Sequence, residues 1–311
     1  MNEIEKCSVA AVVVTYNRKE VLRKCIQALL SQTRLPDEII VIDNASTDGT
    51  DQVVSKEFPQ VTYMRLPENT GGAGGFHEGM KLAYKKGHNW IWVMDDDVIA
   101  KPTALMNLLK AAYKVPDAAF LCSRVISTSG NPMNVPNIDL RPSSSYYPDW
   151  AKLLDKGLVK VREATFVSLM VRRDTLKDVG LPIKEFFIWG DDTEFTLRAT
   201  QDKCAYMVGD SVVVHLRAIE APPHIINETD IRRIRLHFYH IRNLIYCLRK
   251  YGNQKRLLYF VAQKIFLATK ILFIGKYRFL RIKTIMFGLI AGVFFKPRIV
   301  HPTESTGSHP L

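Results

Sequence analysis

Acidic residues are absent from one long part of this chain. Residues 231–303 contain no aspartate or glutamate, although the 311-residue sequence has 31 of them. The same part contains 16 of the 43 lysine and arginine residues. This excess is larger than the net charge of +12 for the whole chain, so the remainder is mildly acidic. The charge therefore divides the chain into a mildly acidic N-terminal part and a strongly basic C-terminal part.

The chain also lacks the marks of a secreted, zinc-binding or membrane-spanning protein. Its five cysteines are scattered and none forms a CxxC pair, which suits a reducing compartment and argues against a structural zinc site. The first six residues are polar, so we expect no signal peptide. The cation-free apolar run at 284–295 has 12 residues, fewer than the roughly 20 that a membrane-spanning helix needs.

Three consecutive aspartates follow a short run of bulky apolar residues. Residues 90–94 are typical of a buried strand, and Asp95, Asp96 and Asp97 come directly after them. Carboxylates this close together repel one another, and burying them is costly unless a cation neutralises them. Oxygen ligands suit Mg²⁺ or Mn²⁺, which are often shared with a substrate's phosphates. A solvated acidic turn before a helix near residue 101 is the alternative.

The N-terminal part alternates between strand-like and helix-like patterns. Strands are expected at 9–15, 38–42, 61–65 and 90–94, with helical segments between them. This rhythm predicts an α/β fold with a mostly parallel central sheet. Ligands of such sheets bind at the carboxyl ends of the strands. The polar residues expected there are Thr15, Asn17, Asp43, Arg65 and the three aspartates.

The rest of the chain is expected to complete this domain and then to become helical. Residues 127–150 are rich in Ser, Pro and Asn and predict a long loop, a candidate lid over an acceptor. Further strands are expected at 165–172 and at 212–214, the second ending at His215. We expect one domain at 1–220, a basic amphipathic helical membrane-associating region at 221–300, and a disordered tail at 301–311.

Two further segments have the composition of a binding site. The segment Asn69–Gly75 contains four glycines before a helix expected at 76–86, and a glycine backbone can approach a ligand closely. A merely flexible loop is the alternative. Asp191, Asp192 and Glu194 follow aromatic residues that include Trp189, so a carboxylate here can have a raised pKa and act as a general base on a hydroxyl. Capping of a helix at 193–201 by Asp192 is the alternative.

The segments at 12–18, 41–50 and 95–97 together resemble family-2 glycosyltransferases of the GT-A fold. The resemblance covers roughly residues 8–250 and implies that Thr15 and Asp43 contact the nucleotide base. It also implies that Asp95 lies near the ribose or the metal and that Asp97 is the more direct metal ligand. The residues expected at the nucleotide sugar are Thr15, Asn17, Asp43, Arg65, Gly72, Asp95 and Asp96.

A narrower resemblance is to bacterial galactofuranosyltransferases. It comes from the glycine-rich segment, the aspartate triplet, the second acidic group and a histidine 23 residues after Asp192. It implies that Asp192 is the catalytic base and that Asp95, Asp97 and His215 hold Mn²⁺ or Mg²⁺. Trp189, Asp191 and Glu194 are the implied acceptor-binding residues. This chain departs from the pattern because Gly190 separates Trp189 from the acids, which puts the contact of Trp189 with the acceptor in doubt.

The segment Tyr239–Asn243 resembles one in related rhamnosyl- and galactofuranosyltransferases. Arg242 is expected either to contact the diphosphate or to lie on a basic helix face, and the sequence does not choose between them. Around it, residues 231–298 mix cations with aromatic and aliphatic residues, which predicts peripheral binding to an anionic membrane surface. Nucleic acid is disfavoured because the region is as apolar as it is basic. Packing into a homo-oligomer is a third alternative.

The resemblance implies an inverting, metal-dependent transfer of galactofuranose from UDP-galactofuranose. The expected acceptor is a polyprenyl-diphosphate-linked glycan at the cytoplasmic face of the membrane, in cell-surface polysaccharide synthesis. Transfer of rhamnose from dTDP-rhamnose is the first alternative. A non-catalytic membrane scaffold is the second, and the presence of both acidic groups argues against it.

Overall fold

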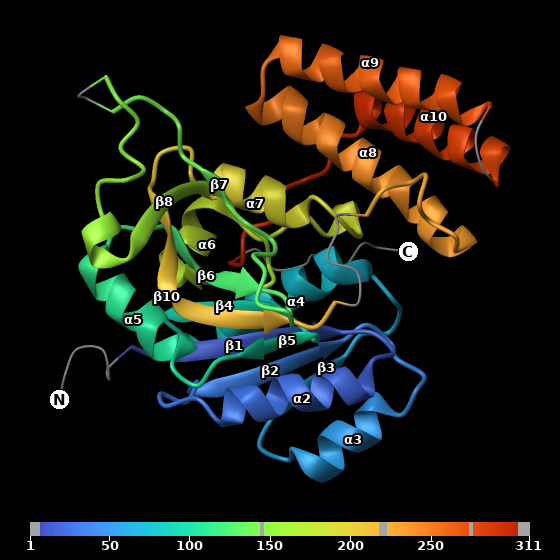
Figure 1. The fold of residues 1–311 in the computed structure, drawn as a ribbon. Helices are drawn as coiled ribbons and strands as arrows, with labels where there is room; N and C mark the ends of the chain where they lie inside the picture. The colour runs from blue at the N-terminus through green and yellow to red at the C-terminus, as the bar shows by residue number, and fades with distance from the viewer. Residues whose placement is uncertain (1–6, 144–145, 218–222, 274–275, 304–311) are drawn as a thin grey trace.

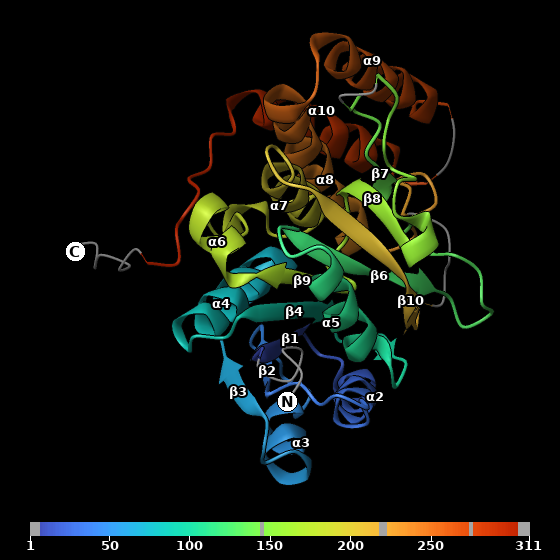
Figure 2. The ribbon, with the colours of Figure 1, turned by 90° about the vertical axis from the view of Figure 1, so that its left-hand side faces the viewer.

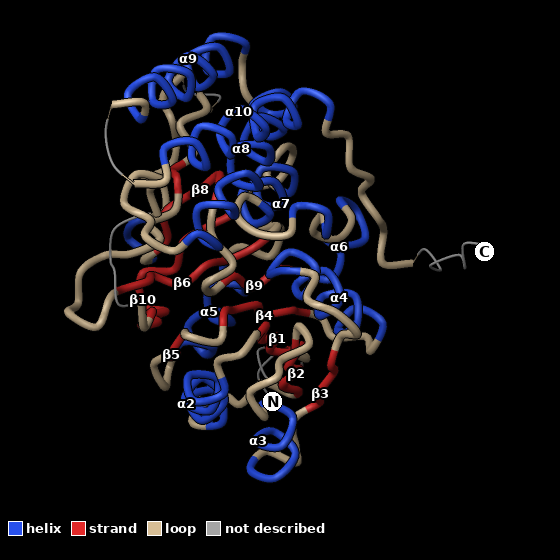
Figure 3. The backbone as a smooth tube through the Cα atoms, turned by 90° about the vertical axis from the view of Figure 1, so that its right-hand side faces the viewer, coloured by secondary structure: helices blue, strands red, loops and turns tan. Residues whose placement is uncertain are grey.

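The computed structural model describes residues 7–143, 146–217, 223–273 and 276–303 (Figure 1). A central mixed sheet is covered by helices on both faces, and three further helices lie beyond one end of these layers (Figures 1 and 3). The expected α/β class with a basic helical C-terminal region is confirmed. The predicted domain boundary near residue 220 stays a prediction, because residues 218–222 lie outside the described residues.

The parallel half of the sheet forms around the first strand. Strand β1 pairs in parallel with β2 on one side and with β4 on the other, and β2 pairs in parallel with β3. Helices α2, α3 and α4 connect these strands as the sequence predicts. The bounds are β1 Val9–Thr15, α2 Lys19–Leu30, β2 Glu38–Asp43, α3 Thr50–Glu57, β3 Thr62–Arg65, α4 Gly71–Lys85 and β4 Trp90–Asp95.

The other half of the sheet pairs in both directions, which the sequence analysis did not predict. Strand β9 is antiparallel to both β4 and β6, whereas β10 is parallel to β6 and antiparallel to β5 and β8. Strand β10 is also much longer than the strand expected at 212–214, and the expected loop at 127–150 contains the short strand β7. The bounds are β5 Val98–Ala100, α5 Ala104–Lys114, β6 Phe120–Ile126, β7 Asn137–Ile138, β8 Leu158–Glu163, β9 Leu169–Arg172 and β10 Ala205–His215.

Two cores lie on opposite faces of the sheet, because successive residues of a strand point to opposite faces. Val9, Ala11 and Val13 of β1 pack into the core under α2, α3 and α5. The alternate residues Ala10, Val12 and Val14 pack into the core under α4, α6 (Arg173–Val179) and α7 (Asp191–Ala199) (Figure 2). All seven residues of β1 are buried, as expected of a strand covered on both faces.

Helix α4 begins at Gly71, five residues before the helix start that the sequence predicts. A Cβ at Gly75 would lie 2.4 Å from Cγ1 of Val14, and one at Gly79 would lie 2.4 Å from Cγ1 of Val12. These two glycines therefore let α4 pack closely on β1. The glycine-rich segment is mainly the first turn of a buried helix rather than a loop.

The basic C-terminal part forms three helices: α8 Ile231–Tyr251, α9 Gln254–Ile271 and α10 Arg278–Phe294. Helix α10 packs closely on α8, since a Cβ at Gly288 or Gly292 would lie 2.9 or 2.7 Å from the Cβ of Ile241 or Ile245. Among the described residues, no helix is both long and apolar enough to cross a membrane. The chain is described to residue 303, and residues 304–311 of the expected disordered tail lie outside the described residues.

Candidate functional site

The aspartate triplet lies at the carboxyl end of β4, where the chain turns directly into β5. Asp96 and Asp97 are each only 3% exposed. Strand β5 pairs with the end of β10, and this pairing places His215 opposite Val98. One ligand atom each from Asp95, Asp97 and His215 lie within 4.8 Å of one another. The structure thus brings together the three residues that the sequence analysis expects to hold a metal ion.

The imidazole of His215 is oriented by Asn134, a residue of the loop at 127–150. Its Nδ1 lies 3.0 Å from Oδ1 of Asn134, and an amide oxygen can only accept, so Nδ1 carries the proton. In the neutral ring Nε2 then carries a lone pair and no proton. This nitrogen lies 3.0 Å from Oδ1 of Asp97. Two lone pairs this close repel unless a proton or a cation lies between them. Histidines that bind a metal through one ring nitrogen typically donate a hydrogen bond from the other in this way.

The charges of the triplet also fit a cation. Burial and the neighbouring charge of Asp97 raise the pKa of Asp95 to about 7. Burial opposes the ionisation of Asp97, but His215 in its protonated form and Arg18 outweigh it and lower its pKa to about 2. With His215 neutral, Oδ1 of Asp97 is buried and accepts no hydrogen bond among the described residues. A divalent ion would be bound by this oxygen and would stabilise the ionised form of Asp95.

Arg18 neutralises part of the triplet, which the sequence analysis did not foresee. Its guanidinium donates to Oδ1 of Asp96 and to Oδ2 of Asp97, both at 2.8 Å. The hydroxyl of Thr15 donates to the other oxygen of Asp96 at 2.7 Å. Burial raises the pKa of Asp96 to about 6, and Arg18 opposes this shift. Asp96 is therefore bound by protein groups, whereas one oxygen of Asp97 remains open to a ligand.

The other strand ends form one hydrogen-bonded group around Ser46. The hydroxyl of Ser46 accepts from the amide of Asn17, and its carbonyl accepts from Arg65, both at 2.8 Å. Asp43, which is 0% exposed, accepts hydrogen bonds from the Ser46 amide and the Tyr63 hydroxyl. The structure therefore brings Asn17, Asp43 and Arg65 together at one edge of the sheet, and their contact with a nucleotide stays a prediction.

Gly72 differs from the glycines around it. A Cβ at Gly71 would lie 2.0 Å from the carbonyl oxygen of Phe187, whereas a Cβ at Gly72 would meet nothing within 4 Å. The amide of Ala73 donates to the same Phe187 carbonyl at 3.1 Å. The first turn of α4 thus contacts the segment before the second acidic group, and Gly72 is the position there with open space beside it.

The backbone of residues 186–190, just before the second acidic group, is strained. Phe187, Trp189 and Gly190 have φ angles of +64°, +60° and +90°, which only glycine adopts without cost. The amide nitrogen of Asn243 on α8 donates to the carbonyls of Phe186, Ile188 and Trp189, at 3.0, 3.2 and 2.7 Å. Asn243 is fully buried. This one side chain therefore clamps the segment from a helix more than 50 residues away.

Arg242 belongs to the same clamp, which differs from both roles that the sequence analysis left open. Its guanidinium donates to the carbonyl of Glu185 at 2.6 Å and to Oδ1 of Asn243 at 2.8 Å. It also lies 3.9 Å from the ring centroid of Phe295. Burial lowers the pKa of Arg242 to about 10. The half-buried guanidinium therefore holds the backbone before Trp189, and a contact with the diphosphate stays a prediction.

A cavity of about 170 Å³ lies beside the second acidic group. The residues that line it come from the acidic segment, from α8 and from the chain before α8, namely Trp189, Gly190, Asp192, Thr193, Pro223, His240, Leu244 and Cys247. Burial lowers the pKa of His240 to about 4, so its imidazole is neutral near pH 7. Aromatic rings, a carboxylate, a hydroxyl and an imidazole are groups that suit a sugar ring with its hydroxyls.

The two acidic groups lie near enough for their charges to interact. The negative charge of Asp192 contributes to the raised pKa of Asp95, and the charge of Asp95 contributes to that of Asp191. Burial raises the pKa of Asp192 to about 6, while the amide of Thr193 opposes the shift by donating to it. Asp192 combines the two features of a general base, namely a pKa near neutrality and a place in the cavity. The cap of α7 is Gly190, not Asp192.

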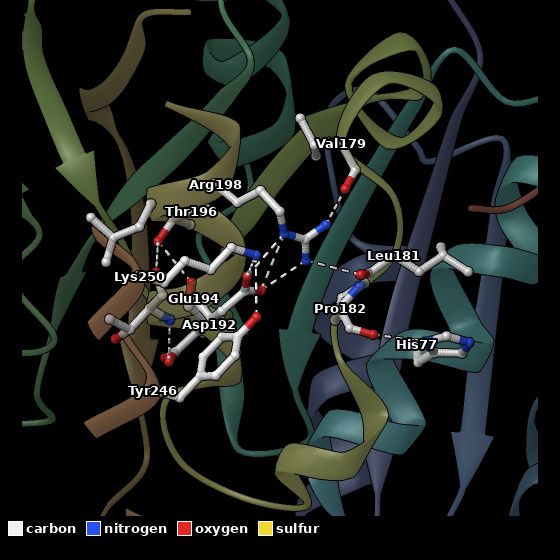
Figure 4. Close-up of polar contacts among 12 residues, drawn as sticks. His77, Val179, Leu181, Pro182, Asp192, Glu194, Thr196, Arg198, Tyr246 and Lys250 are labelled. Carbon is white, nitrogen blue, oxygen red and sulfur yellow. Dashed lines mark hydrogen bonds and ion pairs between the residues drawn. The ribbon is translucent and has the colours of Figure 1, made fainter. Parts of the chain in front are cut away.

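Glu194 lies away from this cavity, contrary to the acceptor-binding role expected of it. It is 0% exposed, and it accepts from Arg198 at 2.8 Å and from the Tyr251 hydroxyl at 2.6 Å. Arg198 also donates to the carbonyls of Val179 and Leu181 (Figure 4). Glu194 therefore joins α7 to α8 and to the end of α6, and its oxygens are occupied by protein donors.

The sequence is similar to a known family and to individual members of it. Residues 10–180 match the model of glycosyl transferase family 2. The galactofuranosyltransferase GlfT1 of Mycobacterium tuberculosis (strain H37Rv) is 33% identical over 210 residues, which cover 61% of this chain and 64% of that protein. GlfT1 of Mycolicibacterium smegmatis is 31% identical over 205 residues, with the same two shares. The chain thus spans just under two thirds of the length of these curated relatives.

A solved structure extends the similarity to the fold. The crystal structure of GalNAc-T7 with UDP, GalNAc and Mn²⁺ has a TM-score of 0.55 to this chain. The match covers 82% of this chain and 54% of that chain at 15% sequence identity. At this identity the likeness concerns the fold alone.

Proposed function

The chain belongs to glycosyltransferase family 2, and we propose that it transfers galactofuranose from UDP-galactofuranose to a glycan. The observation that carries this proposal is the convergence of two acidic groups from distant parts of the chain. Asp95, Asp97 and His215 offer ligands for one divalent ion, and Asp192, which lines a cavity, is near enough for its charge to raise the pKa of Asp95. The relatives named galactofuranosyltransferase support the choice of sugar.

The chain's own residues divide the work between donor and acceptor. Thr15, Asn17, Asp43 and Arg65, at the carboxyl ends of β1, β2 and β3, are proposed to hold the nucleotide together with Gly72. Asp96 is proposed to support this site by accepting from Thr15 and Arg18. When bound, a divalent ion supplies Lewis-acid stabilisation of the negative charge on the departing diphosphate. Its proposed ligands, Asp95, Asp97 and His215, are compatible with Mn²⁺ or Mg²⁺.

Asp192 is proposed to act on the acceptor. Its carboxylate takes the proton from the acceptor hydroxyl while the oxygen forms a bond to the anomeric carbon and the bond to UDP breaks. Attack on the side opposite to the leaving group inverts the anomeric configuration. Trp189 and His240 border the cavity and are proposed to orient the acceptor ring, with Asp191 beside them. A base with a pKa near the working pH combines a large ionised fraction with useful basicity.

The acceptor is proposed to be a glycan linked to polyprenyl diphosphate, used in cell-surface polysaccharide synthesis. The chain would then work as a peripheral protein at the cytoplasmic face of the membrane. Support comes from the 16 cations and the absence of acids in residues 231–303. Such a region is attracted to anionic headgroups, at about 1 kcal/mol for each cation near the surface.

A donor assay tests the proposal. Purified full-length protein is given UDP-galactofuranose or dTDP-rhamnose, with Mn²⁺ and a synthetic lipid-linked disaccharide, and products are identified by mass spectrometry. Transfer from UDP-galactofuranose is expected. Transfer from dTDP-rhamnose alone would replace the proposed donor. Lipid binding without any binding of UDP in the presence of Mn²⁺ would instead favour a non-catalytic scaffold.

A further inference from the structure

Helices α9 and α10 each expose a stripe of large apolar side chains. On α10, Phe279, Phe287 and Phe294 recur at intervals of eight and seven residues, which places them on one side of the helix. On α9, Leu258 and Tyr259 lie eight and seven residues before Phe266, which places the three on one side of that helix. These six side chains are between 58% and 87% exposed, and we call them the outer stripe residues.

This exposure is unusual within the molecule. All five exposed phenylalanines among the described residues lie between positions 266 and 294. Helix α10 buries its opposite side against α8 through Ile285, Gly288 and Leu289, so the helix is apolar on both sides. A soluble helix normally exposes polar residues there. Contiguous exposed apolar surface of this kind marks a site of interaction.

The outer stripe residues lie where a large partner can reach them. In Figures 1 and 3, α9 is farthest from the sheet, and α8 separates it and α10 from the catalytic layers. At the start of α10, a surface hollow of about 490 Å³ is lined by Lys276, Tyr277, Arg278, Phe279 and Leu280. Two cations beside an aromatic ring suit a phosphate group carried by an apolar molecule.

We propose that this face of α9 and α10 docks on the surface of an anionic lipid bilayer. The outer stripe residues enter the interface, and Lys276, Arg278 and Lys283 meet the headgroups. Both components are needed, because apolar insertion and electrostatic attraction add in interfacial binding. The absence of acids from 231–303 means that no carboxylate of this region is brought against the anionic surface.

The charge also decides between a bilayer and the other possible occupants. A second copy docking through the same face would bring cations against cations, since the interface of a symmetric dimer pairs a surface with itself. Nucleic acid would match the charge but has no use for exposed aliphatic residues such as Met286, Ile290 and Val293. An anionic bilayer matches both the charge and the apolar surface.

Docking through α9 and α10 also sets the position of the cavity beside Asp192 relative to the bilayer, and the use of this position rests on the proposed transfer reaction. Helix α8 contributes His240, Leu244 and Cys247 to the cavity beside Asp192, and the same helix packs directly on α10. A chain held through α9 and α10 therefore keeps the cavity one helix away from the lipid surface. An acceptor whose carrier lipid remains in the bilayer could reach it there.

Co-sedimentation of the full-length protein with vesicles tests the docking surface without any sugar. The vesicles contain phosphatidylcholine alone or phosphatidylcholine with phosphatidylglycerol. Wild-type protein should bind the anionic vesicles and not the neutral ones. The triple variant Lys276→Glu/Arg278→Glu/Lys283→Glu should lose at least about a hundredfold in binding, since each cation contributes about fivefold. The variant Phe279→Gln/Phe287→Gln/Phe294→Gln should lose binding by a comparable factor.

A matched control removes three aromatic rings from elsewhere. Tyr113, Tyr146 and Tyr147 are 66%, 91% and 78% exposed, and Tyr113→Gln/Tyr146→Gln/Tyr147→Gln should bind anionic vesicles like the wild type. Binding of UDP with Mn²⁺ should be unchanged in the two triple variants of α10 and the turn before it, which also reports that they fold. If the wild type itself did not bind UDP with Mn²⁺, this would count against the proposed function. The result on vesicle docking would still stand.

Several outcomes would overturn the docking proposal. Wild-type protein that binds neither kind of vesicle would overturn it even if variants could not be purified. Vesicle binding that survives the phenylalanine substitutions would place the contact elsewhere. Self-association that is lost with the phenylalanines, without vesicle binding, would make the occupant a second copy. Binding of single-stranded RNA that is lost in the charge variant, again without vesicle binding, would make it nucleic acid.

Discussion

The two halves of the site are built by different means. On the side of β1 to β4, the functional side chains sit at strand ends, and their positions follow from the local pattern of strand and turn. On the side of α7 and α8, a strained segment is held by Asn243 from more than 50 residues away. The first half depends on regular backbone pairing, whereas the second depends on a few buried polar side chains. Substitutions should therefore separate nucleotide binding from transfer.

The largest expected effect comes from removing the proposed base. Asp192→Asn keeps the shape of the side chain but cannot take a proton, so kcat should fall by about 10²–10⁴-fold. The Kd for UDP with Mn²⁺, measured by calorimetry, should change little, because the nucleotide half is untouched. Asp178→Asn, on the surface of α6, is the control and should keep full activity. Full turnover by the Asp192 variant would remove this residue from the mechanism.

The buried pair of Glu194 and Arg198 should dominate the stability of the second half. Glu194→Gln leaves the Arg198 charge buried without a counter-charge, which costs about 3–5 kcal/mol in such pairs. Thermal unfolding followed by circular dichroism measures this loss. Glu57→Gln removes the partner of Arg23 from an exposed ion pair and should leave Tm unchanged. A stable Glu194 variant with a raised KM for acceptor would restore the acceptor-binding role that the sequence suggested.

Loss of the Asn243 clamp should sharpen the separation between the halves. Asn243→Ala leaves the carbonyls of Ile188 and Trp189 without this donor, at about 1–3 kcal/mol for an unsatisfied buried group. The displaced segment should lower kcat while the Kd for UDP stays within about twofold of wild type, since the first half is intact.

The matched control for Asn243 is Asn253, which caps α9 by accepting from the amide of Arg256. Asn253→Ala should cost about 1 kcal/mol of stability through loss of the cap. It should leave transfer unchanged, because the cap touches no residue of the cavity. Equal losses of kcat in the two variants would mean that stability alone, and not the position of the acidic segment, limits transfer.

Asn134 tests the first half in the same way. Asn134→Gly removes the acceptor for Nδ1 of His215, and glycine tolerates the φ angle of +45° at this position. Affinity for Mn²⁺ should fall by about 10–100-fold, as is usual when a second-shell partner of a histidine ligand is lost. Binding of Mn²⁺ followed by electron paramagnetic resonance measures this directly. Asn134→Asp keeps an acceptor oxygen and should retain the affinity, and equal losses in both variants would contradict the argument.

The first half was predictable because its signals are local. An apolar run that ends in polar residues predicts both a strand and the edge at which Thr15, Asp43 and Asp95 meet. The antiparallel strand β9 and the full length of β10 were not predicted, because pairing partners far along the chain decide them. No local pattern indicates that Asn134 contacts His215 or that Asn243 clamps residues 186–189.

The orientation of Glu194, in contrast, can be derived from the sequence alone. Successive residues of a helix are about 100° apart, so Glu194 lies about 200° around α7 from Asp192. It therefore faces away from whatever Asp192 faces. Arg198, four residues later, is on the same side as Glu194 and pairs with it. The acids of this one motif therefore do not all belong to one site.

The smallest effect concerns pH and tests whether the second half limits the rate. Burial raises the pKa of Asp192 to about 6, and a base works only when ionised. The value of kcat/KM should therefore be flat above about pH 6 and fall about tenfold for each pH unit below it. UDP binding measured over the same range separates this titration from any change in the nucleotide half. The residual activity of Asp192→Asn should lack the acidic limb, and an unchanged limb would assign it to another group.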